Sequence, residues 1–351
     1  MSWLQRTSRR PVGVDVGRRH IKAAQFNRGG AAWRAPSVAV ARRDAADGTL
    51  VAEDARQVRQ LLGSRGLRGD AVVLALPAEM VLTGILELPP RDSGAPIDRL
   101  AGQELARMHN GDPDSIEVAC WDLPAPARAA NTTFVMAVGC RHDDANGLMD
   151  LFEEQGLHVE ALEVHACAVA RACRGLIAET SGLAGILDVG WASARLVLVY
   201  RGVIVYERRL AKGGLDGLLR SLGQELGLST DAAERLLRDG GLSNGTGQAP
   251  GEGRGAGGFA ADACFSAMID EMRIPLSYLA NQYPDVSMER LVLVGGGATI
   301  PGLKEYLSAG LGVPVQVAGP TDLAPCPESF DSEHGPALAV AMGLGQFEGA
   351  G

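Results

Sequence analysis

A short motif that occurs twice constrains the fold of this chain more than any other feature. Residues 12–17, VGVDVG, form an apolar run that contains one aspartate and ends at a glycine, and residues 185–190, GILDVG, repeat the pattern. Short continuous apolar runs bounded by turn residues are typical of buried strands. A strand–Asp-x-Gly unit that occurs in both halves of a chain predicts two similar lobes that face one cleft.

The first copy of the motif opens a series of predicted strands. Residues 21–26 and 33–40 read as strands that extend the same sheet. The run AVVLAL at 71–76 is typical of a buried strand and is closed by Pro77. We expect these elements to belong to a first lobe at 10–180.

A smaller unit interrupts the first lobe. Residues 81–88 and 132–139 read as strands, and a helix is expected before Gly156. Between the two strands, apolar residues recur at helical spacing, at Ile97, Leu100, Ala101, Leu105 and Met108. These elements predict a small α/β insert at about 82–164.

The second copy of the motif is followed by a similar series. Residues 194–200 and 202–210 are typical of a hairpin. Residues 290–303 predict a strand, a triple-glycine turn and a helix. We expect these elements to form a second lobe at 181–347.

Helices and one low-complexity stretch separate that hairpin from the triple-glycine turn. Ser229 or Thr230 is suited to cap a helix, with Glu234 completing a capping box. The Gly-rich residues 239–260 predict a mobile loop. The helix that follows contains Pro275, which we expect to kink the helix or end it early.

Composition limits the classes of function. The net charge of −9 argues against a nucleic-acid binder, because such proteins need a basic face. No apolar run reaches the roughly 18–20 residues that a membrane span needs, and no secretory signal is recognisable. The six cysteines contain no C-x-x-C pair, so we expect free thiols in a reducing cytoplasm. The six histidines show no metal-ligand spacing, so a metal site built only from side chains is not expected.

Three glycine turns that follow apolar strands have the chemistry of a phosphate site. They are Asp15-x-Gly17, Asp188-x-Gly190 and Gly295-Gly296-Gly297. A glycine lets the backbone approach a phosphate closely, and successive N–H groups form an anion nest. A carboxylate beside each of the first two turns can hold Mg²⁺ through water.

Lysines lie beside glycine turns in two places. Only three of the 33 basic residues are lysines. Lys22 follows Gly17 on the predicted hairpin, and Lys212 precedes Gly213 and Gly214. The position of Lys22 favours neutralisation of a β- or γ-phosphate.

Longer stretches resemble the actin-like ATPase superfamily, which includes actin, Hsp70, sugar kinases and FtsA, and within it the PilM family of type IV pilus assembly. They include VGVDVGRRHIK, VVLALPAEMVLTGILELPP, RLAGQELARM and RLVLVGGGATIPGLKEYLSAGLGVPVQV. Together with further stretches they cover nearly the whole chain except the Gly-rich segment and the last residues. The resemblance implies an α/β, actin-like two-lobed ATPase fold of duplicated ribonuclease H-like domains. It also implies an inserted small α/β subdomain of the FtsA/PilM type.

The resemblance further implies ATP with Mg²⁺ between the two lobes. Asp15 and Asp188 would be the carboxylates on the metal side, Gly17 and Gly190 the phosphate turns, and Lys22 the phosphate lysine. The other residues expected at the nucleotide are Arg18, Arg19, Ser193, Gly213, Gly214, Glu234, Arg238, Gly295, Gly296 and Gly297. Of these, Glu234 and Arg238 match positions that contact the adenosine in such folds.

Three departures from the family pattern favour nucleotide binding over turnover. Arg18 stands where the first turn normally has Ser or Thr, and Trp191 follows the second turn. His165 stands where PilM-like sequences tend to have a glutamate that can orient water. Glu163 is a candidate substitute, but it lies two residues earlier, and two positions along a helix point in different directions. Losing such a group costs about 10²–10³-fold in rate, whereas Arg18 and Arg19 add positive charge for a polyphosphate.

The resemblance implies a partner as well. In PilM-like proteins a groove that involves the insert receives the N-terminal tail of the membrane protein PilN. We therefore expect a cytoplasmic ATP-binding scaffold at the inner face of the inner membrane, beside a PilN/PilO pair. It would contact the membrane only through its partners, and nucleotide would set lobe closure and groove shape. The sequence leaves open whether the chain is a homo-oligomer.

Two other readings remain open at the level of sequence. One is a nucleotide-free structural scaffold similar to the cytoplasmic region of GspL. The other is an active phosphotransferase of the actin fold or an FtsA-like division protein, although no convincing catalytic aspartate is apparent for a phosphotransferase.

Overall fold

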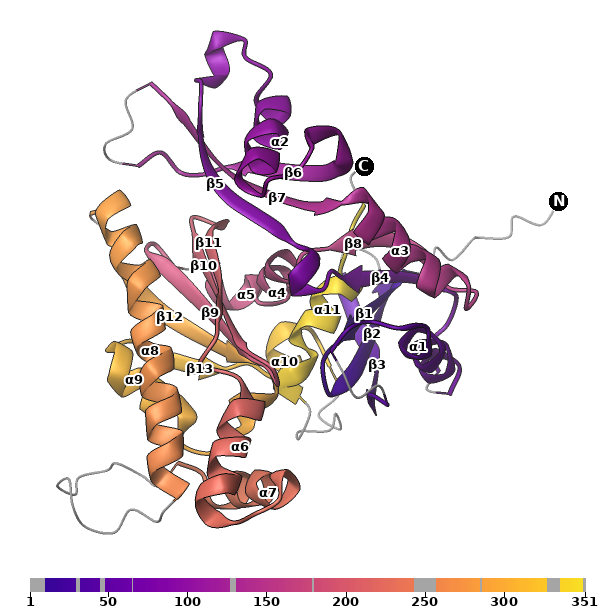
Figure 1. Ribbon diagram of the computed structural model, residues 1–351, viewed down its shortest axis with the longest axis vertical. Helices are drawn as coiled ribbons and strands as arrows, with labels where there is room; N and C mark the ends of the chain where they lie inside the picture. Colours follow the sequence, from indigo (N-terminus) through magenta and orange to yellow (C-terminus); the bar gives the residue numbers. More distant parts are fainter. Residues whose placement is uncertain are drawn as a thin grey trace.

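The computed structural model describes residues 10–29, 32–44, 48–64, 66–126, 131–178, 180–242, 257–284, 286–326 and 335–349. Within these ranges the strands form two five-stranded sheets and one three-stranded sheet. Figure 1 shows the two larger sheets side by side and the smaller sheet at the top of the view.

The first sheet carries the first Asp-x-Gly motif on its central strand. Its order is β3-β2-β1-β4-β8. The hairpin strands β1, β2 and β3 pair antiparallel, whereas β4 pairs parallel with both β1 and β8. The strands are β1 (Val12–Val16), β2 (His20–Gly29), β3 (Ala32–Arg42), β4 (Ala71–Ala75) and β8 (His158–Glu163).

The second sheet repeats this order and these directions. It runs β11-β10-β9-β12-β13, with an antiparallel hairpin and two parallel pairings. The strands are β9 (Leu183–Val189), β10 (Ala194–Tyr200), β11 (Val203–Leu210), β12 (Met288–Val294) and β13 (Val315–Val317). Because β9 has the place of β1, Asp188 is the counterpart of Asp15. The predicted duplication is therefore confirmed at the level of the whole sheet.

The third sheet belongs to the insert. It has the antiparallel order β5-β7-β6, with strands β5 (Leu82–Leu88), β6 (Ile116–Asp122) and β7 (Thr133–Arg141). Helix α2 (Ile97–Met108) covers one face of it through the buried Ala101 and Leu105. Residues 142–163, which lie within the range expected for the insert, join the first lobe in the structure. There β8 pairs with β4, and α3 (His142–Glu153) adds its buried side chains to the core of the first sheet.

Helices surround the two large sheets. They are α1 (Ala52–Ser64), α4 (His165–Ala172), α5 (Arg174–Ile177), α6 (Leu215–Leu226), α7 (Thr230–Gly240), α8 (Gly257–Gln282), α9 (Leu303–Leu311), α10 (Pro320–Leu323) and α11 (Ala339–Gly345). Short 3₁₀ turns are η1 (Ala78–Met80), η2 (Arg91–Ser93), η3 (Pro113–Ser115), η4 (Gly296–Thr299) and η5 (Gly335–Leu338). None of the helices in the described ranges is both long enough and apolar enough to span a membrane.

Helices α4 and α11 pack against each other between the two large sheets. The core there includes Phe26 of the first sheet and Ile186 of the second, so it is shared by both lobes. Contact is close because the facing residues are small. A Cβ atom at Gly343 would lie 1.8 Å from the carbonyl oxygen of Ala168, and one at Gly13 would lie 2.1 Å from the amide nitrogen of Gly345. These glycines let the helices reach each other and the sheet.

The structure changes two expectations for the helices of the second lobe. Ser229 caps α7 by accepting from the amide of Ala232, but Glu234 lies beyond the capping position and forms ion pairs instead. Helix α8 continues through Pro275, so the proline does not end it early. Residues 243–256 of the predicted Gly-rich loop lie outside the described residues.

Candidate functional site

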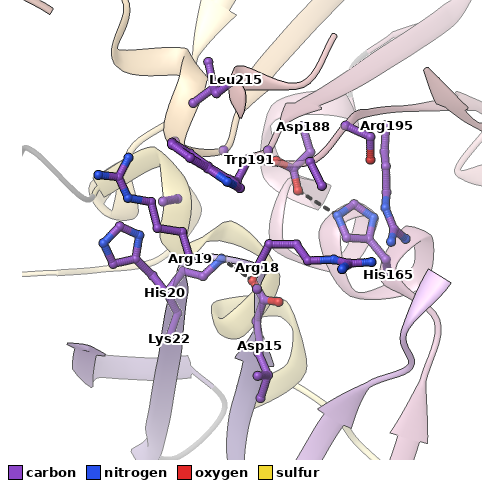
Figure 2. A pocket seen from close by; sticks show the side chains of 18 of the residues that line it. Asp15, Arg18, Arg19, His20, Lys22, His165, Asp188, Trp191, Arg195 and Leu215 are labelled. Carbon is purple, nitrogen blue, oxygen red and sulfur yellow. Dashed lines mark hydrogen bonds and ion pairs between the residues drawn. The ribbon is translucent and has the colours of Figure 1, made fainter. Parts of the chain in front are cut away.

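A cleft of about 240 Å³ lies where the two Asp-x-Gly turns face each other. Its walls come from both lobes: the Gly17 and Gly190 turns, the end of β4, η4 and α7. Twelve of the residues expected at a nucleotide line it, namely Asp15, Gly17, Arg18, Arg19, Lys22, Asp188, Gly190, Ser193, Glu234, Arg238, Gly295 and Gly296. Figure 2 shows that the side chains of Arg19, Lys22, His165 and Trp191 gather around this space.

The two turns have the same backbone geometry. The amide of Gly17 donates to the carbonyl of His20 at 2.9 Å, and that of Gly190 donates to the carbonyl of Ser193 at 3.2 Å. A Cβ atom at either glycine would lie 3.0 Å from that carbonyl oxygen, which is tighter than nearly all real contacts. Glycine therefore keeps both turns tight and leaves their backbone open to a ligand.

Asp15 pairs with Lys22 across the first hairpin. The two residues are directly opposite each other in the register of β1 and β2, and Lys22 Nζ lies 2.5 Å from Asp15 Oδ2. Burial by itself would lower the pKa of Lys22, but the charge and hydrogen bond of Asp15, with the charge of Asp188, raise it above its ordinary value. Lys22 is therefore a permanent positive charge at the floor of the cleft.

Asp188 pairs with His165, which begins α4. His165 Nε2 lies 2.7 Å from Asp188 Oδ2, and because a carboxylate only accepts, the imidazole donates. Burial by itself would raise the pKa of Asp188. The hydrogen bond and charge of His165 outweigh this effect and, with the nearby charges of Lys22 and Arg195, lower the pKa from its ordinary value.

Arg195 is a cleft residue that the sequence reasoning missed. It lies opposite Asp188 in the register of β9 and β10, as Lys22 lies opposite Asp15 in the first lobe. A signal was present, because the spacing from aspartate to basic residue is the same in both copies of the motif. Glu79, Arg209 and Thr299 also line the cleft without having been expected there.

Arg19 joins the lobes across the mouth of the cleft. Its Nη1 lies 2.5 Å from Glu234 Oε2 on α7, and its Nη2 lies 3.7 Å from Asp231. Its guanidinium carbon lies 4.2 Å from the centre of the Trp191 ring. A residue of the first turn thus contacts two elements of the second lobe.

Arg18 points to a different wall. Its Nη2 lies 3.9 Å from Glu79, and its guanidinium covers Gly48, where a Cβ atom would overlap it. Both arginines that follow Gly17 therefore have carboxylate partners, one in each lobe.

The structure does not bring Gly213, Gly214 and Gly297 to the wall of the cleft. A Cβ atom at Gly214 would lie 2.4 Å from the carbonyl oxygen of Ala192, and one at Gly297 would lie 2.2 Å from Val189. Gly213 is similarly tight against Met268. These glycines let α6 and η4 pack against the second turn and its strand, so they position the turn from behind.

Gly295 has a different role, because it packs against a carboxylate of the cleft. Its φ of 87° is in the left-handed region, which favours glycine. A Cβ atom there would lie 2.1 Å from Asp188 Oδ1. With His165 at Oδ2 and Gly295 at Oδ1, both carboxylate oxygens of Asp188 have close neighbours.

Glu163 is not available to orient water, and its position two residues before His165 already argued against that role. It lies at the end of β8 and forms a two-point ion pair with Arg171, including a contact of 2.7 Å from Arg171 Nη1. Arg171 also donates to the carbonyl of Gly343 on α11 at 2.9 Å. This carboxylate therefore stabilises the packing of α4 and α11.

The donors of the cleft do not fit a divalent cation held by the protein. Mg²⁺ requires oxygen ligands in near-octahedral geometry. Within the described ranges, no three His, Cys, Asp or Glu side chains converge on a point that a metal could occupy. Asp15 and Asp188, which the resemblance places on the metal side, are each engaged by a donor of the chain.

The duplicated sheets, the paired turns and the cleft between them define the two-lobed fold of the actin-like ATPases. MreB5 of Spiroplasma citri bound to ADP is similar to this chain with a TM-score of 0.53 and 13% identity, covering 96% of this chain and 95% of that one. EutJ, an ethanolamine utilization protein from Carboxydothermus hydrogenoformans, has a TM-score of 0.52 and 16% identity, covering 96% and 89%.

A family model goes further. The model for the type IV pilus assembly protein PilM matches residues 13–346, which is nearly the whole chain, so the chain belongs to the PilM family. A chain from a PilM–PilN type IV pilus biogenesis complex is similar to it, with a TM-score of 0.75 and 23% identity, covering 96% of this chain and 97% of that one.

Proposed function

We propose that this chain is an ATP-binding scaffold of a type IV pilus, or a related secretion, assembly machine, and that it docks the N-terminal tail of a PilN-like inner-membrane protein. Membership of the PilM family carries this proposal. The chain would lie in the cytoplasm at the inner face of the inner membrane, beside a PilN/PilO pair. The expected Mg²⁺ is not part of the proposal, because the donors of the cleft do not fit it.

The geometry of the cleft supports the nucleotide. Two glycine turns line the cleft, one from each lobe, and Lys22 lies in it with its positive charge secured by Asp15. Backbone N–H groups at glycine turns and a lysine are the usual donors to a polyphosphate. Structures of the same fold include one with bound ADP, MreB5 of Spiroplasma citri.

Isothermal titration of the full-length chain with ATP tests this part of the proposal. Removing a charged hydrogen-bond donor costs about 1.5–3 kcal/mol, so Lys22→Ala should weaken binding about 10- to 100-fold. Lys304→Ala, at an exposed position on α9 outside the cleft, is the matched control and should bind as the unaltered chain does. Absence of saturable binding, or equal affinity for Lys22→Ala, would contradict the assignment.

The pairing of the carboxylates in the cleft supports binding of ATP rather than its hydrolysis. Each of the four that line the cleft, Asp15, Glu79, Asp188 and Glu234, has an ion-pair or hydrogen-bond partner. A general base or water-orienting group must be within reach of the attacking water and able to accept its proton. We therefore expect steady-state ATP hydrolysis to stay at background under conditions in which ATP is bound, and turnover well above background would contradict this.

The position of the insert supports a partner site that responds to the closure of the two lobes. Trp121 Nε1 on β6 donates to the carbonyl of Ile204 on β11 at 2.9 Å, and the hydroxyl of Tyr283 donates to the carbonyl of Pro124 at 2.8 Å. The insert thus contacts the second lobe directly, so a change in lobe closure would shift it.

Fluorescence anisotropy with a labelled peptide tests the partner. The peptide is the N-terminal tail of the PilN-like membrane protein encoded with this chain. We expect saturable binding whose affinity differs with and without saturating ATP, because nucleotide sets lobe closure. A peptide of the same composition in scrambled order is the control. Equal binding of both peptides would contradict the docking site, and identical affinity with and without ATP would contradict the coupling alone.

A further inference from the structure

The charged side chains that line the cleft favour an anionic ligand. Six Arg or Lys side chains line the cleft, and four Asp or Glu side chains do so. Basic side chains are therefore in excess even after every carboxylate is counted against one of them. An excess of positive charge favours an anionic ligand such as a polyphosphate.

The two carboxylates at the floor of the cleft are neutralised from within the chain. Lys22 contacts Asp15 at 2.5 Å, and the two side chains are equally buried, each with 16% of its surface exposed. His165 contacts Asp188 at 2.7 Å, and only 10% of the imidazole is exposed. A carboxylate that already accepts a charged or strongly polarised donor has less to gain from the hydration shell of a metal ion.

His165 is the residue that engages Asp188 from within the chain. It stands at the start of α4 with its ring directed at Asp188 (Figure 2). Its other ring nitrogen, Nδ1, is buried and has no hydrogen-bond partner in the described part of the chain. The ring is therefore held from one side only, by the carboxylate. Arg195, opposite Asp188 in the β-hairpin register, adds a positive charge near this carboxylate.

We propose that this cleft binds the triphosphate of its nucleotide without a divalent cation, with Lys22 and His165 engaging Asp15 and Asp188 in its place. The inference rests on the proposed nucleotide function and deepens it. Lys22 neutralises phosphate charge from the first lobe. Arg195 does so from the second lobe, while His165 keeps Asp188 from repelling the phosphates. His165 is a positioning residue in this scheme, because it acts through Asp188.

Titration of the unaltered full-length chain with ATP, once in EDTA and once in excess MgCl₂, tests the inference directly. We expect the affinity in EDTA to equal or exceed that in MgCl₂. A requirement for Mg²⁺, seen as affinity at least tenfold higher in MgCl₂, would overturn the inference and leave the proposed nucleotide function standing. Absence of binding in both buffers would overturn the inference together with the function on which it rests.

Two substitutions of His165 show whether this residue is responsible. His165→Glu places a carboxylate beside Asp188, and we expect it to weaken ATP binding in EDTA by at least tenfold and to recover affinity in MgCl₂. His165→Gln keeps a side-chain donor toward Asp188, and we expect it to stay independent of Mg²⁺. If the ATP affinity of His165→Glu is independent of Mg²⁺ while circular dichroism shows that the variant is folded, the role given to His165 is contradicted. A structural role alone would weaken both variants in both buffers alike.

Electron paramagnetic resonance of Mn²⁺ gives a readout separate from affinity. With ATP bound to the protein at saturation, we expect titrated Mn²⁺ to bind no more tightly than it binds ATP in buffer. Tighter Mn²⁺ binding to the protein–ATP complex would show that the chain contributes ligands and would overturn the inference.

Discussion

At the scale of single residues, a buried ion pair holds one wall of the cleft. Arg43, which directly follows β3, forms two hydrogen bonds with Asp54 of α1, at 2.5 and 2.6 Å, and both side chains are 1% exposed. Arg43 also donates to the carbonyl of Thr49, and Asp54 accepts from the amide of Val51. The segment held in this way includes Gly48 and Leu50, which line the cleft.

Asp54→Ala should destabilise the chain by about 3–5 kcal/mol, because it leaves the Arg43 guanidinium buried without its partner. Asp216→Ala removes an exposed ion pair with Arg220 on α6 and should cost less than about 0.5 kcal/mol. Urea unfolding of both variants compares the two costs. A similar loss in the two variants would contradict the role given to the buried pair.

Glu207 offers a test by pH. Burial raises the pKa of this β11 carboxyl above its ordinary value, although the charges of His165 and Arg195 oppose the rise. A carboxyl whose pKa is raised in the folded state stabilises the fold below its unfolded pKa of 4.5, and that contribution is lost as pH rises through the folded value. At neutral pH the ionised Glu207 therefore costs stability.

Glu207→Gln should consequently stabilise the chain, and more so at about pH 8 than at about pH 5. The free energy of unfolding in urea at the two pH values measures the difference. Equal effects at both values, or a larger gain in acid, would show that the carboxyl is not penalised by burial.

The sequence predicted single residues of the cleft better than their partners. Asp15, Lys22 and Gly17 lie on one hairpin, so their proximity follows from local spacing. The pair of His165 with Asp188 joins α4 to β9, and the pair of Arg19 with Glu234 joins the two lobes. Such contacts depend on packing between distant segments, for which a single sequence contains no local signal.

At the scale of elements, the close packing of α4 and α11 determines how the two lobes meet. Gly343→Ala would place a methyl group 1.8 Å from the carbonyl oxygen of Ala168, so one of the helices must move. We expect a loss of about 1–3 kcal/mol or more in unfolding free energy, as for overpacked cores. Gly147→Ala on α3, where nothing lies within 4 Å, should instead stabilise the chain by about 0.5–1 kcal/mol.

Thermal unfolding of these two alanine variants measures the difference, which helix propensity alone would not produce. If both variants gained stability, the close packing of α4 against α11 at Gly343 would be contradicted.

Helix α8 shows why a proline inside a helical pattern need not end the helix. A proline inside a helix costs about 3 kcal/mol, which favours a break at Pro275. In the structure, Met268 and Met272 before the proline and Leu279 after it are buried in the same core. Burial of a large apolar side chain contributes about 1.5–3 kcal/mol. The burial of these three side chains, on both sides of the proline, therefore outweighs the free-energy cost of the proline.

At the scale of the whole molecule, Arg19 couples the lobes through Glu234 and Trp191. The ion pair is partly buried, with 18% of the Arg19 and 24% of the Glu234 side chain exposed. A cation–π contact contributes about 0.5–2 kcal/mol, so Arg19→Ala should loosen the lobes without unfolding them. We expect faster hydrogen exchange at the start of α7 in this variant. Arg220→Ala, which removes a pair within one lobe, is the control. Unchanged exchange in α7 for Arg19→Ala would contradict the coupling.

The most direct test of a nucleotide cleft between two lobes is hydrogen–deuterium exchange with and without ATP. A ligand that bridges the lobes should slow exchange at both turns together, residues 17–20 of the first lobe and 190–193 of the second. The three-stranded sheet and α9 lie away from the cleft and should show no direct protection. Protection of only one turn, or of neither at saturating ATP, would contradict a nucleotide site built from both copies of the motif.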